Sequence, residues 1–320
     1  MKLNIALPGL IWPDLGDLEY IYSNLVIDNI SQLLKRGTIS YLPFGYSDLI
    51  YESTFSVVKQ NFAMQMAQQL QVANKYTTFL IAEPTHLRVD RDRLLISESE
   101  ILQLNSEEAD TIINAINLHF NQEISLYYIK PNLWLIGLNY NLSDNKFYPI
   151  LDIIGENIDE YLPHGTNSIH ISRILNEIQM LLFNLGLNQT REANGLLTIN
   201  SLWLWNKKNC ANIKTHFNNI IMGVNDLDIK NLNHLADNDL IIIDKLYYAS
   251  RYRDSHSWRN NLELVDEIIA KPLLNLYHSK KLNDITILIP ENNQTLKLSI
   301  NRFSRYKFWQ KHNLINLSRR

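Results

Sequence analysis

The sequence predicts one α/β domain over residues 1–320, with a mixed, mostly parallel central sheet flanked by helices. Short runs rich in β-branched and aromatic residues alternate with longer segments whose apolar residues recur every three and four positions. The composition, 46% hydrophobic and 20% charged, is that of an ordinary globular protein. No apolar run reaches the roughly 18 residues of a membrane span, so we expect these elements to pack into a core.

The strongest helix signal begins at Thr166. Apolar residues at helical spacing predict a core helix that Thr166, Asn167 or Ser168 caps and that Gly186 ends in the left-handed conformation. Burial of this face provides on the order of 10–20 kcal/mol of gross driving force. The face consists of Ile171, Ile174, Leu175, Ile178, Leu181, Leu182 and Leu185.

A strand signal follows the Asn194-Gly195 turn. Residues 197–205 carry apolar side chains on both faces, which predicts a central strand covered on both sides. Trp203 and Trp205 are expected to point the same way, with acceptors for their indole N–H groups. Residues 188–194 are expected to form a polar loop between helix and strand.

The remaining elements are predicted from the same periodicities. Residues 139–165, rich in Asn, Asp, Pro and Gly, are expected to form an irregular seam or lid. Helices are expected at 17–36, 53–70, 106–120, 226–235 and 262–277, and strands at 3–7, 76–82, 124–129, 133–138, 219–224, 239–244, 285–289 and 296–300.

Charge and composition limit the classes of binding partner that we expect. A net charge of −3 gives no whole-chain attraction to nucleic acid or anionic lipid. The basic and aromatic residues of 302–320 fit single-strand binding, but with this net charge we interpret them as a solvated terminal helix. The single Cys210 excludes an internal disulfide, and the short apolar start is broken by Pro8, so a cytoplasmic location without membrane contact is expected.

Standard catalytic motifs are missing from the sequence. The nine histidines show no HxH, HxxH or HxxxH spacing, and there is no CxxC, so no metal site is expected. There is also no GxSxG elbow, GxxxxGK[ST] loop or GxGxxG fingerprint, so no cofactor is expected. These absences leave open whether the protein is an enzyme.

The best chemical candidate for a site is the charged run after the strand at 76–82. Ligands of open α/β sheets bind beyond the carboxyl ends of strands, where His86 and Arg88 could hold an anion. Asp90 and Asp92 could hold a cation or serve as acid and base. The alternative, which we favour, is a structural turn whose arginines and acids are paired.

Two further charged residues lie on the polar loop between the core helix and the strand. Arg191 and Glu192 are distant in the sequence from the charged run. On this loop, either residue could face a ligand. The alternative is that they hold the helix and strand in register.

Two segments resemble the bacterial regulatory protein E of the regulation-of-pathogenicity-factors group, which is often labelled phosphoglycerate-mutase-like. They are "AEPTHLRVDRDRLL" (82–95) and "NEIQMLLF" with "TREANGLLTINSLWLW" (176–205). The resemblance implies a cytoplasmic protein of a Gram-negative bacterium with a role in virulence regulation. The mutase label implies an alkaline-phosphatase-like fold with an Asp/His two-metal centre and a Ser nucleophile, none of which can be placed on this sequence.

Together these observations favour a cytoplasmic regulatory or interaction protein on an enzyme-like α/β scaffold without a recognisable catalytic centre. Its partner would be another protein or a small anionic ligand. The alternative is a phosphoglycerate-mutase-like enzyme or a sensor of a small phosphorylated anion, with contacts drawn from His86, Arg88, Asp90, Asp92, Arg191 and Glu192.

Overall fold

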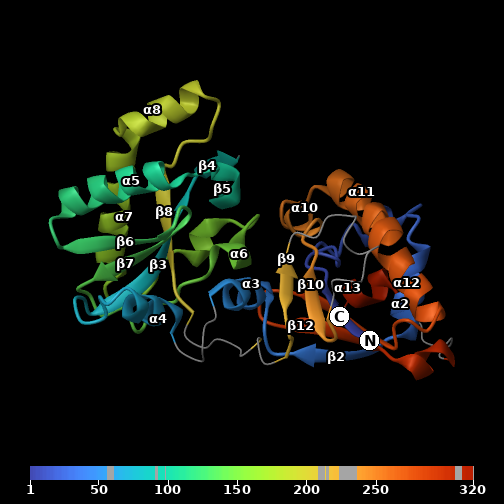
Figure 1. Ribbon diagram of the computed structural model, residues 1–320. Helices are drawn as coiled ribbons and strands as arrows, with labels where there is room; N and C mark the ends of the chain where they lie inside the picture. The colour runs from blue at the N-terminus through green and yellow to red at the C-terminus, as the bar shows by residue number, and fades with distance from the viewer. Residues whose placement is uncertain are drawn as a thin grey trace. The chain divides into compact units, whose positions relative to one another are not determined.

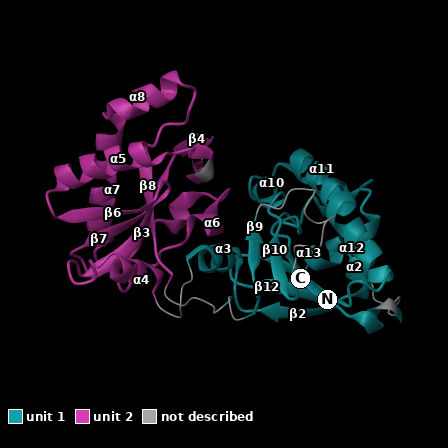
Figure 2. Cartoon of the chain, viewed as in Figure 1, with its two compact units in different colours: residues 1–56, 211–320 teal, residues 57–210 magenta. Residues whose placement is uncertain are grey.

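The chain forms two compact units in the computed structural model. Unit 1 comprises residues 1–56 and 211–320, and unit 2 comprises residues 57–210 (Figure 2). The structure describes residues 1–55, 61–90, 93–97, 99–207, 213, 216–222, 236–306 and 312–319. The expectation of a single α/β domain over residues 1–320 stays a prediction.

Unit 1 contains a six-stranded mixed sheet in the order β2-β12-β11-β1-β10-β9 (Figure 1). Strand β1 pairs in parallel with β10 and β11, and β10 pairs in parallel with β9. Strand β12 runs antiparallel to both β11 and β2. The predicted mixed, mostly parallel sheet is therefore confirmed in this unit. Its strands are β1 (Lys2–Ala6), β2 (Thr38–Leu42), β9 (Ile220–Met222), β10 (Asp239–Ile242), β11 (Asp284–Pro290) and β12 (Thr295–Ile300).

Helices flank this sheet and supply its core. Leu3 and Ile5 of β1 pack in one cluster with buried residues of α2, α11 and α12, such as Leu33 and Leu262. The helices are α1 (Leu18–Tyr22), α2 (Asp28–Arg36), α3 (Tyr46–Phe55), α10 (Tyr247–Arg251), α11 (Ser255–Val265), the π-helical turn η5 (Asp266–Ala270), α12 (Lys271–His278), the 3₁₀ turn η6 (Arg302–Tyr306) and α13 (Leu314–Ser318).

Unit 2 contains a four-stranded sheet in the order β6-β7-β3-β8, and every pairing in it is antiparallel. A separate two-stranded hairpin, β4–β5, follows β3. The mostly parallel arrangement expected for the whole chain does not extend to this unit. The short β6–β7 hairpin requires an antiparallel pair, and β3 is antiparallel to both β7 and β8 as well. The strands are β3 (Thr78–Thr85), β4 (Leu87–Asp90), β5 (Arg93–Ile96), β6 (Ile124–Lys130), β7 (Leu133–Leu138) and β8 (Ser201–Trp205).

Helices cover both faces of the unit 2 sheet. On one face, Ile112 of α5 and Ile178 of α7 are fully buried in a cluster with strand residues such as Leu204. On the other face, Phe62 of α4 stacks on Trp205, with ring centroids 5.5 Å apart. The helices are α4 (Phe62–Gln69), the 3₁₀ turns η1 (Ser99–Leu102) and η2 (Ile158–Tyr161), α5 (Ser106–Phe120), α6 (Ile150–Ile153), α7 (Ser168–Phe183) and α8 (Gly186–Ala193).

The predicted core helix is present as α7, but the segment after it differs from the prediction. The helix ends at Phe183, and Gly186 begins α8 instead of closing α7. The predicted polar loop 188–194 is largely this second helix. Its buried side chains are Asn188 and Arg191, so apolar periodicity could not reveal it.

The predicted strand 197–205 is shorter and differently placed. Only β8, residues Ser201–Trp205, is a strand, and it is the last in the sheet order instead of a central one. Burial on both faces is confirmed, since all five residues are buried. The indole N–H groups also have acceptors: Trp203 donates to the Tyr148 carbonyl at 2.7 Å and Trp205 to Glu83 Oε1 at 2.6 Å.

One further predicted helix differs, and two others fall wholly or partly outside the described residues. The helix expected at 17–36 is divided into α1 and α2, with Asn24 in the left-handed region at φ 55°. Residues 56–60 of the helix expected at 53–70, and the whole helix expected at 226–235, lie outside the described residues. The segment 139–165 lies within unit 2 and contains α6 and η2. Among the helices that the structure describes, none has the length and apolarity needed to cross a bilayer.

Candidate functional site

The charged run after β3 forms the β4–β5 hairpin instead of a loop at the end of a parallel strand. Strand β3 continues to Thr85 and is antiparallel to both neighbours, so the strand-end argument for a site does not apply here. Arg88 and Asp90 are exposed on β4. Asp92 lies outside the described residues.

His86 is half-buried and holds the hairpin to the segment before β8. Its Nδ1 lies 2.8 Å from the Thr198 carbonyl oxygen and 3.2 Å from Thr198 Oγ1. Beside it, the Asn200 side chain accepts from the Leu87 N–H at 2.7 Å and donates to the Leu87 carbonyl at 2.8 Å. The His86 and Asn200 side chains thus form hydrogen bonds with backbone groups that would pair with a neighbouring strand in a regular sheet.

Arg191 is 1% exposed, and its guanidinium is held inside unit 2. It donates from Nη1 to Glu108 Oε1 at 2.8 Å and from Nε to the Leu197 carbonyl at 2.9 Å, and Nη2 donates to the Leu102 carbonyl. The structure therefore brings Arg191 and His86 to the same short segment, 197–198. Glu192, the next residue, is exposed.

Glu83, another acid of the charged run, is a buried partner of the sheet. It is 3% exposed, accepts from Trp205 Nε1 through Oε1 and accepts from Ser99 Oγ through Oε2 at 3.0 Å. These two hydrogen bonds offset part of the cost of burying the carboxyl group.

An apolar groove lies in unit 2 between the β4–β5 hairpin and the end of α7. Its volume is about 580 Å³, and Leu87, Leu94, Met180 and Phe183 are among its lining residues. Met180 is 68% exposed and Phe183 is 82% exposed. In the sequence, both residues lie outside the apolar face of the predicted helix. A large apolar residue outside that face is the signal that could have indicated an exposed binding surface.

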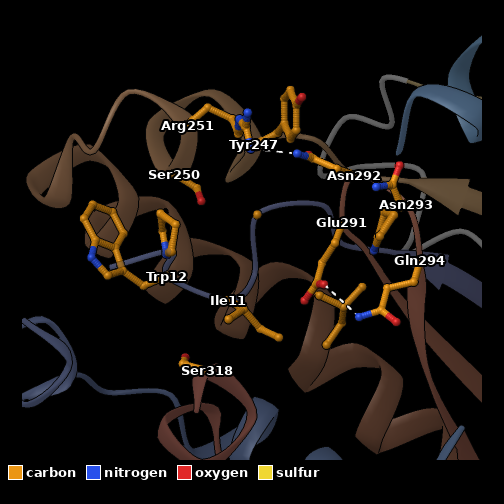
Figure 3. Close-up of a pocket in the computed structure, with 14 residues that line it drawn as sticks. Ile11, Trp12, Tyr247, Ser250, Arg251, Glu291, Asn292, Asn293, Gln294 and Ser318 are labelled. Carbon is orange, nitrogen blue, oxygen red and sulfur yellow. Dashed lines mark hydrogen bonds between the residues drawn. The ribbon is translucent and has the colours of Figure 1, made fainter. Parts of the chain in front are cut away.

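A second cavity, of about 530 Å³, lies in unit 1 near the carboxyl ends of β1 and β11 (Figure 3). Its walls come from the segment after β1, from α10 and from the β11–β12 turn, and its charged lining residues are Arg251 and Glu291. Gly9 has φ 75°, and a Cβ there would lie 2.7 Å from the Leu246 carbonyl oxygen, so this approach requires glycine. The sequence analysis did not predict this site. The Pro8-Gly9 pair after a buried strand is the one signal that could have pointed to it.

Hydrogen bonds behind the cavity fix its wall. Burial raises the pKa of Tyr22, whose hydroxyl accepts from the Trp12 N–H at 3.2 Å and lies 3.2 Å from Ser318 Oγ. Trp258 donates from Nε1 to the Gly9 carbonyl at 2.7 Å and packs edge-on against Trp12 at 5.3 Å. The Tyr22 hydroxyl, the Trp258 N–H and the packing of the two indole rings fix the position of this wall.

The donor set of the described residues does not fit the two-metal centre that the mutase label implies. Over the described ranges, no three His, Cys, Asp or Glu side chains lie close enough together to hold a metal ion. The wall of the unit 1 cavity offers one guanidinium, one carboxylate, hydroxyls and amides instead.

Part of the chain is similar in sequence to a cofactor-independent phosphoglycerate mutase. The 2,3-bisphosphoglycerate-independent phosphoglycerate mutase of Methanosarcina mazei is 26% identical over 113 residues, which is 35% of this chain and 28% of the mutase. The aligned part thus spans less than a third of that enzyme. No family model matches the sequence.

Two solved structures are similar over most of the chain. The cofactor-independent phosphoglycerate mutase of Thermoplasma acidophilum has a TM-score of 0.37 and 14% identity, with 99% of this chain and 97% of that chain covered. The PH0037 protein of Pyrococcus horikoshii has a TM-score of 0.41 and 11% identity, with 94% and 87% covered.

Proposed function

We propose that this chain is a cytoplasmic regulatory or interaction protein on a phosphoglycerate-mutase-like α/β scaffold, of the kind represented by regulatory protein E of the regulation-of-pathogenicity-factors group. The observation that carries the proposal is the apolar groove beside α7. Large apolar side chains exposed together on a soluble protein mark interaction sites. Met180 and Phe183 meet this description at the rim of a groove with Leu87 and Leu94.

The partner that suits this groove is a protein segment that inserts apolar side chains between the hairpin and α7. Paired residues of the hairpin share a face, and the register of Val89 with Leu94 places Val89 on the same face as Leu94. Val89 is 76% exposed, so the apolar surface continues beyond the groove along the hairpin. Gln179, Asn184 and Asn200 supply polar groups at its edge.

Site-specific photo-crosslinking in the native cell tests this proposal. A photoreactive residue at position 183 is expected to yield a discrete protein adduct. The matched control is position 118, because Leu118 is an apolar residue of α5 that is 84% exposed and does not line the groove. Substitution of Met180 by Ser should weaken the adduct at 183 without changing the melting temperature appreciably, since Met180 is exposed. Equal adducts at 183 and 118, or none at 183, would contradict the proposal.

The alternative is a mutase-like enzyme or a sensor of a small phosphorylated anion, and the partial similarity to the Methanosarcina mazei enzyme favours it. In this alternative His86, Arg88 and Arg191 are the anion contacts, and Asp90 or Asp92 serves as acid, base or ligand. Glu192 is the remaining candidate residue of the site. An alkaline-phosphatase-like ancestry belongs to this alternative.

Thermal melting with phosphoglycerates, nucleotides and divalent metals distinguishes the two proposals. A ligand at about 100 times its dissociation constant stabilises by roughly 2.7 kcal/mol. A shift that is lost in Arg88→Ala, together with mutase activity of the purified protein, would establish the enzyme. A shift without turnover would establish the sensor. If no compound shifts the transition, the anion alternative is wrong.

A further inference from the structure

We propose that strand β2 joins two copies of this chain into a symmetric dimer, in which β2 pairs antiparallel with β2 of the second copy about a two-fold axis at Ser40. Strand β2 is at one end of the unit 1 sheet, so β12 lies on one side of it and no strand of the described residues lies on the other (Figure 1). An unpaired sheet edge is a template for a further strand. This surface is separate from the groove of unit 2.

The hydrogen bonds of the β11–β12 hairpin determine which residues of β12 face β2. The Glu291 N–H donates to the Gln294 carbonyl at 2.9 Å and closes the hairpin. Bonded and non-bonded pairs alternate from there, so the pair of Leu288 with Lys297 is a non-bonded one. The Leu288 carbonyl accordingly accepts from the Leu7 N–H at 2.8 Å, on the other side of β11. The backbone groups of Lys297 therefore point toward β2.

The same alternation determines which backbone groups of β2 point away from the sheet. Ser40 is opposite Lys297, so its N–H and C=O face β12. The groups of its neighbours Ile39 and Tyr41 point outward. Among the described residues, these N–H and C=O groups have no hydrogen-bond partner. The edge thus offers two donors and two acceptors.

The residues on either side of this edge limit the pairing to one register. The Gly37 N–H is already bonded to a carbonyl of α2 at 3.3 Å, and Pro43 has no N–H. With Ser40 opposite itself, Ile39 of each copy exchanges both of its hydrogen bonds with Tyr41 of the other. The next register in either direction leaves a carbonyl of Ile39 or Tyr41 opposite a residue that cannot donate.

The side chains of β2 also suit a second copy. Thr38–Leu42 contains no charged residue and no proline, and it pairs with β12 without a bulge, so it lacks the features that keep edges apart. Tyr41, which is 50% exposed, would lie opposite Ile39 of the second copy, and such aromatic and β-branched pairs stabilise antiparallel strands. Ser40 is exposed and small enough for the close approach at the axis.

Disulfide crosslinking tests the register. Cys210 is the only cysteine of the sequence, so the variants are made with Cys210→Ser. Ser40→Cys places two thiols opposite each other with Cα atoms about 4.5 Å apart, which a disulfide can span. We expect mild oxidation with diamide to yield a covalent dimer. Leu42→Cys is the matched control, because residue 42 is opposite residue 38 in this register and the two thiols lie about 13 Å apart.

Charges at position 40 test the same contact in solution. An edge contact is small, so we expect a weak dimer that sedimentation equilibrium detects over a concentration series. Ser40→Asp should raise the dissociation constant about fivefold, or by about 1 kcal/mol, because two carboxylates meet at the axis. Within one copy the new carboxylate lies opposite Lys297, which favours the folded strand.

A mixture of Ser40→Asp and Ser40→Lys should restore the dimer, because unlike charges then lie opposite each other. Ser299→Asp is the matched control, since Ser299 lies on the same face of the neighbouring strand β12, and it should leave the dissociation constant unchanged. A monomer at every concentration, equal crosslinking at positions 40 and 42, or an unchanged dissociation constant in Ser40→Asp would overturn the proposal. None of these outcomes depends on the crosslink at position 183.

Discussion

At the residue scale, the buried polar side chains explain how unit 2 is held together. Asn188 donates to the carbonyls of Leu182 and Ile199, each at 2.8 Å, and accepts from the Ile199 N–H at 2.9 Å. Together with Arg191, it connects α8 to the segments on either side of it. The sequence identified Arg191 as a residue of interest, but the type of partner could not be predicted because Glu108 and Leu102 are distant in sequence.

Arg191→Met should lower the free energy of unfolding by about 3 kcal/mol, because it leaves Glu108 and two carbonyls without their donor. Chemical denaturation measures the loss. The control is Glu192→Gln, an exposed neighbour whose change should stay within about 0.5 kcal/mol. If Arg191→Met is neutral for stability and abolishes a ligand response, Arg191 belongs to a binding site instead.

At the element scale, one continuous helical run from Ser255 to His278 organises unit 1. Its π-helical turn precedes Pro272, which has no N–H to donate to the preceding turn of a helix. Asp266 in this turn is 4% exposed and accepts from the Ile30 N–H at 2.6 Å and from Asn29 Nδ2 at 2.7 Å. A carboxylate from one helix therefore stabilises the amino end of α2, which a local reading of either segment cannot reveal.

The amino end of the same run gives a pH prediction. The pKa of Asp254 is lowered by the hydrogen bond from the Ser257 side chain and then by that from the Ser257 N–H, which Oδ1 accepts at 3.0 Å. Because the folded-state pKa lies below the ordinary value of 3.8, the ionised carboxylate contributes stability that is present above about pH 3.8. That contribution is lost as the pH falls through the folded-state value.

We therefore expect wild type to be more stable than Asp254→Asn at neutral pH, and the difference to shrink below about pH 3.8. Denaturant titrations of both proteins at a series of pH values measure it. Asp254→Ala should cost about 1 kcal/mol at neutral pH through loss of the cap. A difference between wild type and Asp254→Asn that does not vary with pH would rule out this role of the charge.

At the scale of the whole molecule, the two units have separate hydrophobic cores. The cluster around β1 contains residues of unit 1, and the cluster around α5 and α7 contains residues of unit 2. Unit 1 is assembled from both ends of the chain, with β1 between β10 and β11. Periodicity along the chain could not reveal this division, because it does not record which distant segments share a core.

Ile178→Ala should cost about 2–5 kcal/mol, because the side chain is fully buried in the unit 2 core. Met180→Ala, on the exposed side of α7, is the control and should stay within about 0.5 kcal/mol. Native-state hydrogen exchange should quicken in unit 2 of Ile178→Ala while β1 and β11 stay protected. Faster exchange in both units would instead support the single domain that the sequence predicts.

The sequence by itself determined the elements whose side chains repeat with a regular period. The helices α5 and α7 and the strands β6, β7, β11 and β12 were all predicted, because the helical and strand periods depend on the local sequence regardless of the rest of the fold. The tertiary structure alone decided the antiparallel pairing of β3, the polar contacts of α8, and the meeting of Arg251 with Glu291 at one cavity. Each of these depends on segments far apart in the chain coming together, and the spacing of residues within a segment carries no record of that.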